Sequence, residues 1–470
     1  MSNMTKNHKI ILLLLSLCMF IVVLDSAIIN VALPAIKEAL QFDNASLQWV
    51  LTAYILTFGG FLLLGGRTAD LYGRRRVLVL GLVGFGFVSL LIGLSGSSLM
   101  MIILRALQGL TAAFMAPTAL SILLTTFKEG EARNKALSIW SIVASGGAAA
   151  GVFLGGLLTQ YFGWQWCFFV NVPICVLAVI GILKYIPAHI QESKDKHLDL
   201  PGAVSVTGGL MSLVYALTLA SSLGWTAQST VTAFALSILL IGLFVFNENK
   251  AKHPLMRLSI FRIRNVTGGN LIMLPIVAGA LGMFFFLSQY VQNVLQYSPV
   301  MSGLCFLPIP IIIGIISFQA PRLLDRFGFK PLMVVGTGLV TVGVLIISFL
   351  NVGSSYWFHL LPAFILLAVG FGLSFVAITV AATSGLPPHE SGLAAGLINT
   401  SQQVGGALGL AVLAVVANTA TASRLSVGED MTMASVYGYH QAFLTAAALS
   451  ALACLVAIFV IRVPKPVREV

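Results

Sequence analysis

Long apolar runs alternate with short polar or Gly- and Pro-rich breaks from residue 10 to residue 462. Each run is long enough to cross a bilayer as a helix, which takes about 20 residues. The runs lie near residues 10–32, 46–66, 77–95, 99–124, 136–160, 166–187, 202–221, 229–247, 267–290, 302–321, 331–350, 357–381, 393–416 and 440–462. The pattern therefore predicts an all-α polytopic membrane protein with 14 transmembrane helices.

Composition agrees with a membrane protein, because 58% of the 470 residues are hydrophobic and only 9% are charged. Soluble domains carry about 25% charged residues. The net charge of +11 would suggest a nucleic-acid partner in a soluble chain, but in a membrane protein lysine and arginine accumulate in cytoplasmic loops. We therefore expect a lipid bilayer as the surroundings and no nucleic-acid partner.

The positions of the basic residues predict the orientation. If the N-terminus is cytoplasmic, almost all of the 26 lysines and arginines fall in cytoplasmic segments. The outer loops then hold only Lys37 and Arg424, and Arg105 lies within a span. This asymmetry predicts an even number of spans, with both termini on the cytoplasmic side of the membrane.

A weak internal repeat divides the chain. The stretch 66–75 between spans 2 and 3 is echoed by 321–330 between spans 10 and 11, and the glycines of span 5 are echoed in span 13 by Gly405 and Gly409. We predict an N-terminal six-helix bundle at 1–187, a two-helix insert at 188–265 and a C-terminal six-helix bundle at 266–470. Repeated halves with a site at their interface are typical of transporters.

Asp25 stands alone in the apolar stretch 10–33. A carboxylate there costs about 3 kcal/mol on insertion scales, so it indicates a functional site. From the helix rise, Asp25 and Arg105 lie roughly 12 Å and 10 Å from the same membrane face. We expect the two to interact directly or through water. Pairing favours the charged carboxylate and burial favours the neutral one, so a switch between those environments would suit proton coupling; a static structural pair is the alternative.

Two glycine-containing motifs indicate close packing or tight turns. Gly66, Asp70, Gly73 and Arg74 have a spacing that suggests a tight turn with charges held against neighbouring helix ends, although the bases could serve only to keep the loop inside. In span 5, Gly147, Gly151 and Gly155 are four residues apart and share one helix face, which permits close helix packing. Packing alone and a role in gating both remain open for these glycines.

Several motifs in order resemble one family. They are Leu24–Pro34, Gly66–Arg75, Leu104–Gly109, Trp164–Pro173, Tyr290–Gln292 with Tyr297–Pro299, and Asn399–Gly406. Together they cover nearly the whole chain and resemble the major facilitator superfamily, in particular its fourteen-span drug:proton antiporters typified by quaternary-ammonium exporters. At one point the chain departs from the antiporter pattern: the motif usually has Gly-Pro where this chain has Gly151-Val152. That departure removes one argument for antiport but none for the fold.

The resemblance implies that spans 1 and 4 line the cavity of the N-terminal half, with Asp25 and Arg105 coupling transport to protons. It implies that Gly66, Asp70, Gly73 and Arg74 form a conformational latch. We expect no cofactor, with the proton gradient as the energy source, no metal, and a monomer.

Polar and aromatic residues in or near the spans are candidates for a substrate cavity, with packing or lipid contact as the competing explanation. They are Asn30, Tyr54, Gln108, Asn171, Phe285, Gln289, Tyr290, Asn399 and Gln403.

The leading hypothesis is proton-coupled efflux of small lipophilic or cationic compounds by alternating access. The alternative within transport is a dedicated exporter of one antibiotic, siderophore or lipid, with or without proton coupling. An enzyme is not expected, because the 7 histidines are scattered without an HExxH or similar set, and no P-loop for ATP is present.

Overall fold

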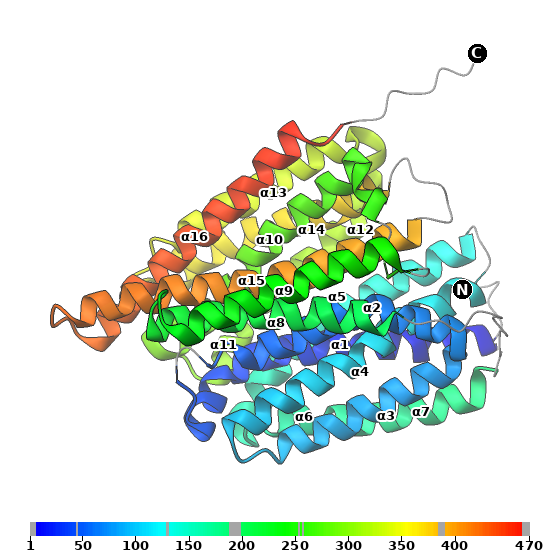
Figure 1. Cartoon of the computed structure of the whole chain (residues 1–470), viewed down its shortest axis with the longest axis horizontal. Coiled ribbons are helices and arrows are strands. Elements are labelled where there is room, and N and C mark those ends of the chain that lie inside the picture. The colour runs from blue at the N-terminus through cyan, green and yellow to red at the C-terminus, as the bar shows by residue number, and fades with distance from the viewer. Residues whose placement is uncertain are drawn as a thin grey trace.

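Fourteen helical spans long and apolar enough to cross a membrane occur in the described part of this computed structural model, as the hydropathy pattern predicts. The structure describes residues 6–43, 46–127, 131–187, 199–251, 254–255, 258–383 and 391–462. α1 begins and α16 ends at the same end of the bundle (Figure 1). We call this the terminal end and the opposite one the distal end.

The first six spans comprise α1 (Lys6–Leu40), α2 (Trp49–Tyr72), α3 (Arg74–Gly93), α4 (Ser98–Thr126), α5 (Glu131–Tyr161), and α6 (Trp166–Phe169) with α7 (Asn171–Tyr185). The next two spans are α8 (Leu200–Leu223) and α9 (Gln228–Lys250). The last six comprise α10 (Arg264–Gln289) with η2 (Tyr290–Val294), α11 (Pro299–Phe306) with α12 (Pro308–Phe327), α13 (Phe329–Ile347), η3 (Tyr356–Leu360) with α14 (Leu361–Thr383), α15 (Ser391–Leu425) and α16 (Met431–Phe459). The short helix η1 (Leu258–Arg262) precedes α10.

The two sets of six spans pack by the same scheme. In the first, α1 packs on α5, α2 on α4, and α3 on α7; in the second, the equivalent pairs are α10 on α15, α12 on α14, and α13 on α16. The insert helices α8 and α9 pack on each other. This scheme agrees with the repeat seen in the sequence, while the boundaries at residues 187 and 265 stay predictions.

The echoed loops have the same geometry in both halves. Gly73 and Gly328, which join α2 to α3 and α12 to α13, have φ of 95° and 76°, a region that favours glycine. Two residues further on, Arg75 donates to the Leu183 carbonyl at 2.7 Å, and Lys330 donates to the Ile461 carbonyl at 2.9 Å. Leu183 lies in the last turn of α7, and Ile461 lies just beyond the end of α16, so each base binds a carbonyl near a helix C-terminus, where a cation is favoured.

The halves meet along two seams, one between α2 and α15 and the other between α5 and the pair α11–α12, and also where α1 contacts α10. The insert covers the first seam, because α8 packs on both α2 and α15. Gln48 at the start of α2 donates to the Thr218 hydroxyl of α8 at 3.1 Å. Around the bundle, apolar side chains such as Ile238 and Leu239 of α9 are 73% and 59% exposed, as suits a surface that faces lipid.

Candidate functional site

Asp25 and Arg105 form a buried ion pair between α1 and α4. The Arg105 Nη1 lies 2.8 Å from the Asp25 Oδ2, and both residues are fully buried. The depth argument from the sequence therefore placed the two groups correctly. A charge-assisted bond of this length, away from water, is among the strong polar contacts in a protein.

The other carboxylate oxygen of Asp25 is also saturated with donors. Its Oδ1 accepts from the Gln108 Nε2 at 2.9 Å and from the Asn171 Nδ2 at 2.8 Å. Gln108 lies three residues after Arg105, hence on the same face of α4, and Asn171 is the first residue of α7. Three donors, one of them cationic, therefore satisfy both oxygens of the buried carboxylate.

Arg105 has further partners that do not depend on Asp25. Its Nε donates to the Val50 carbonyl of α2 at 2.8 Å, and its Nη1 also donates to the Gln108 Oε1. The guanidinium carbon lies 4.4 Å from the centre of the Tyr54 ring, within the range of a cation–π contact. Loss of the negative charge on Asp25 would thus leave the guanidinium with partners.

Three of the candidates for the substrate cavity are instead part of the network around Asp25 and Arg105. Gln108 and Asn171 donate to Asp25, and Tyr54 covers Arg105. All three are buried, so contact with a substrate would require the network to open. The residue that sequence reasoning missed here is Ser89 of α3, whose hydroxyl accepts from the Gln108 Nε2 at 2.9 Å. A serine in an apolar helix gave no distinguishing signal.

The candidates from span 9 are packed inside the C-terminal half. Phe285 is 1% exposed and its ring lies 5.0 Å from that of Phe286, while the Tyr290 hydroxyl donates to the Asn351 carbonyl at 2.5 Å. Gln289 lines a small cavity with Asn418, Thr421 and Ser435, among others.

The remaining three candidates lie at different places. The Asn30 amide donates to the Ser26 carbonyl within α1 at 3.0 Å. Gln403 lies at the seam of α15 with α2, since a Cβ on Gly59 would be 2.5 Å from its Cβ. Asn399 is exposed one turn earlier on α15. The structure does not gather the nine cavity candidates into one site, and their contact with a substrate stays a prediction.

The span-5 glycines bring α5 against α1 beside Asp25. A Cβ on Gly151 would lie 2.8 Å from the Leu24 carbonyl, and one on Gly155 would lie 2.6 Å from the Ile28 carbonyl. A Cβ on Gly147 would lie 3.1 Å from the Phe20 carbonyl. In the other half, Gly405 and Gly409 make the same approach of α15 to α10. The close packing expected of these glycines is therefore present, and a role in gating stays a prediction.

The loop between α2 and α3 has the tight turn that its glycine spacing predicts. Asp70 accepts from the Arg74 Nη2 at 2.9 Å and from its Nε at 3.0 Å, one helical turn on. The glycine that the turn requires is Gly73, whereas a Cβ on Gly66 would meet only ordinary contact with Pro117. A role as a conformational latch remains an expectation.

The halves are also joined by hydrogen bonds near the distal end, and Pro34 explains one of them. A proline inside a helix has no N–H, so the carbonyl four residues earlier, that of Asn30, has no intrahelical partner. The Ser288 hydroxyl of α10 donates to this carbonyl at 2.5 Å, and the Gln292 Nε2 donates to the next one, of Val31, at 3.0 Å. We call these two bonds the distal clasp.

Replacing Pro34 with alanine is expected to weaken the distal clasp. Residue 34 would then have an N–H that competes with Ser288 for the Asn30 carbonyl, and one hydrogen bond is worth about 1 kcal/mol net. The distal ends of α1 and α10 should therefore separate several-fold more often. Spin labels at Ala39 and Gln296 would show this as a larger population of long distances. Ser288→Ala should act in the same direction, and an unchanged distance distribution in both variants would contradict this view of the clasp.

Buried charge in the spans is concentrated at this one site. Among the described residues, the buried charged side chains are Asp25, Arg105 and Glu248, and Glu248 lies at the terminal end of α9. The C-terminal half buries amides and hydroxyls, such as Asn270 and Ser374, but no charged side chain in its described part. Asp25 is therefore the deep carboxylate of the described structure. No group of three or more potential metal ligands occurs there either.

Comparison with known proteins gives one consistent result. The family model of the Major Facilitator Superfamily matches residues 15–410. A puromycin resistance protein of Streptomyces alboniger is 40% identical over 92% of this chain and 86% of its own length. A cephamycin export protein of Amycolatopsis lactamdurans is 37% identical over 89% and 86%, and a multidrug resistance protein of Mycobacterium tuberculosis is 30% identical over 88% and 76%. Among solved structures, the nucleoside transporter NupG superposes with a TM-score of 0.69 at 12% identity, over 96% of this chain and all of that one.

The family model and the relatives thus show a multi-pass membrane transporter and not an enzyme. The chain belongs to the major facilitator superfamily.

Proposed function

We propose that this transporter exports small lipophilic or cationic compounds, including antibiotics, in exchange for protons. The observation that carries the proposal is the buried Asp25–Arg105 pair, because a lone deep carboxylate is costly in a membrane and persists where it has a function. We further propose that the protein lies in a bacterial cytoplasmic membrane with its terminal end in the cytoplasm, as the basic loops favour.

The coupling step follows from the contacts of the pair. Three donors stabilise the ionised carboxylate in the closed network, whereas opening of the network would remove donors and leave a buried acid that favours the neutral form. A proton taken up by Asp25 would break the ion pair, and Arg105 would remain held by Val50 and Gln108. Protonation would thus bias which helices stay packed around α4, which is how a charge can be linked to a conformational change.

The names of the relatives support export of antibiotics or drugs. Two are named for single antibiotics and one as a multidrug protein. A broad exporter of the quaternary-ammonium type and a dedicated exporter of one compound both fit these names. The clasp joins the two halves at the distal end, which supports alternating access between them. Asp70 and Arg74 would act as a latch at the terminal end.

Purified protein in liposomes under an imposed pH gradient tests this function. Puromycin, a cephamycin and ethidium would be offered to vesicles with an acidic interior, so that outward proton flow drives uptake. Ethidium is the most informative compound, because a permanent cation is not trapped by acid as an amine is. Antiport predicts uptake several-fold above that of protein-free vesicles, and the increase should disappear when an ionophore collapses the gradient.

The outcomes separate the alternatives. Gradient-driven uptake of several unrelated compounds supports a multidrug exporter, and uptake of one compound only supports a dedicated exporter. Equal uptake with and without the gradient would overturn proton coupling and leave facilitated diffusion.

A further inference from the structure

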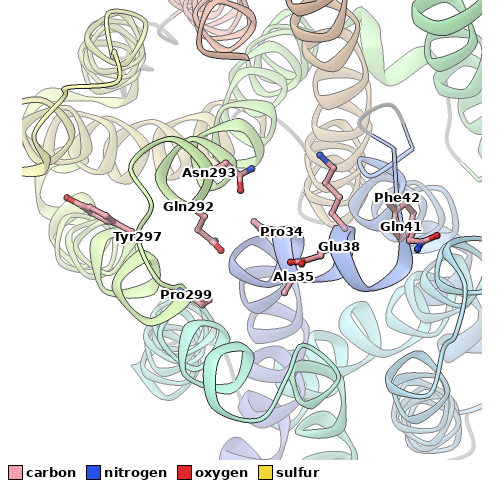
Figure 2. A pocket seen from close by; sticks show the side chains of 10 residues that line it. Pro34, Ala35, Glu38, Gln41, Phe42, Gln292, Asn293, Tyr297 and Pro299 are labelled. Atoms are coloured by element: carbon pink, nitrogen blue, oxygen red, sulfur yellow. The ribbon is translucent and has the colours of Figure 1, made fainter. Parts of the chain in front are cut away.

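A cavity opens at the distal end, between the end of α1 and the segment after α10 (Figure 2). Its volume is about 590 Å³, within the usual range of small-molecule sites. One wall is formed by Pro34, Ala35, Glu38 and their neighbours in α1, and the other by residues 292–299. The two walls belong to different halves of the transporter, so the cavity changes shape whenever the halves move.

The distal clasp adjoins this cavity through Gln292. Gln292 lines the cavity and at the same time donates its Nε2 to the Val31 carbonyl, while Pro34, which frees the Asn30 carbonyl for Ser288, lines the opposite wall. A compound released when the clasp opens would therefore pass through this space.

The polar groups of the cavity favour a cation. Glu38 and Gln292 both line the cavity, and Figure 2 shows the side-chain oxygen of Gln292 pointing towards α1, with the Glu38 carboxylate at the end of that helix. Glu38 is exposed, and in the described part of the chain it forms no ion pair. The neighbouring Lys37 also lines the cavity, and the negative charge of Asp43 acts on it. Glu38 is thus the carboxylate left to meet a ligand.

We propose that this cavity is a second binding site, separate from the Asp25 network, which takes small organic cations through Glu38 on the distal side of the clasp. The inference rests on the proposed export function, in which the cavity would be the last site that an exported compound occupies before release. Glu38 supplies charge, and the amides of Gln292 and Asn293 supply acceptor oxygens for N–H groups of the ligand. Because the site is open to water, its binding is weak and sensitive to salt, which suits release.

Protection of a cysteine in the cavity wall tests the site. Ala35→Cys would be labelled by a membrane-impermeant maleimide applied from the distal side, with and without propidium, an impermeant aromatic cation that carries amino groups. No pH gradient is applied, so the measurement does not depend on transport. Among the native cysteines, four are buried and Cys454 is partly buried, and the parent chain gives their background. If the cysteine at position 35 is labelled poorly, the same measurement can be made on Gln41→Cys, at an exposed position of the lining.

The expected result is slower labelling in the presence of propidium. Glu38→Gln should raise the concentration for half-maximal protection by about tenfold, because it removes the attraction between the carboxylate and the cation. Glu38→Asp should keep most of the protection. Glu429→Gln, which removes one carboxylate from another distal loop, should keep all of it.

High salt should reduce protection in the wild type and have little effect on Glu38→Gln. No protection at either cysteine, or equal protection in Glu38→Gln and the wild type, would overturn the site even if gradient-driven transport is found. Protection without any transport would instead overturn the proposed function and leave the site standing.

Discussion

Replacing Asp25 with asparagine is expected to abolish the stimulation of transport by a pH gradient, so that uptake with and without the gradient becomes equal. Asparagine has nearly the shape of aspartate and keeps one oxygen that can accept from Gln108 and Asn171. It cannot take up a proton at accessible pH, and its amide would face the donor Nη1 of Arg105. The unpaired Arg105 cation costs stability, but the fold should persist, because the guanidinium keeps its contacts with the Val50 carbonyl, Gln108 and the Tyr54 ring.

Uptake of ethidium into liposomes with an acidic interior provides the measurement. Glu429→Gln is the matched control for the loss of one carboxylate, since its pair with Arg424 is exposed and contributes little to stability. Asp25→Glu should retain part of the response, because the carboxylate is kept but displaced by one methylene. Because Asp25 is the deep carboxylate of the described structure, a full gradient response in Asp25→Asn would exclude the coupling mechanism proposed above.

Replacing Arg105 with alanine is expected to destabilise the protein by about 3–5 kcal/mol, the usual cost of leaving a buried charge without its partner. The variant removes the cation beside Asp25, the bond to the Val50 carbonyl and the contact with Tyr54. Arg105→Lys should be less severe, because it keeps the charge while losing the fixed planar fork that holds Val50 and Asp25 together. Both variants should transport poorly.

The double variant Asp25→Asn with Arg105→Ala distinguishes how much stability is lost through the unpaired charge from how much is lost through the packing of Arg105. If the uncompensated carboxylate is the main defect, the double variant should be more stable than Arg105→Ala alone, as measured by thermal unfolding in detergent. The coupling energy from such a cycle isolates the pair. Additive losses would show that Arg105 acts mainly through its packing on α2, and the ion pair would then be secondary to stability.

Sequence reasoning reached the span count and the Asp25–Arg105 contact for a common reason. A bilayer requires every backbone group of a span to be satisfied within a helix, so hydropathy alone marks the spans and the helix rise fixes the depth of each residue. Depth alone was enough to predict the contact between Asp25 and Arg105, because few charges lie deep in this chain. Depth was not enough to predict that Gln108 and Asn171 contact Asp25, since it does not tell which way an amide points around its helix.

The distal clasp shows a second limit. Pro34 and Gln292 were visible in motifs, but nothing in the sequence joined them to Ser288, more than 250 positions from Asn30 in the chain. That contact depends on how closely the two halves approach at the distal end, a property of the whole bundle. The same holds for the cavity of Glu38, a residue that reads in the sequence as an ordinary exposed charge at a helix end.

The sequence by itself determined the membrane class, the fourteen spans, the repeated halves and the one deep carboxylate, because hydropathy, helix rise and rare buried charges are local properties. Only the tertiary structure decided which side chains complete the Asp25 network, how the freed Asn30 carbonyl is used, and where a cavity opens between the halves. Those features depend on the rotation and tilt of helices packed against one another, and a one-dimensional pattern does not specify these angles.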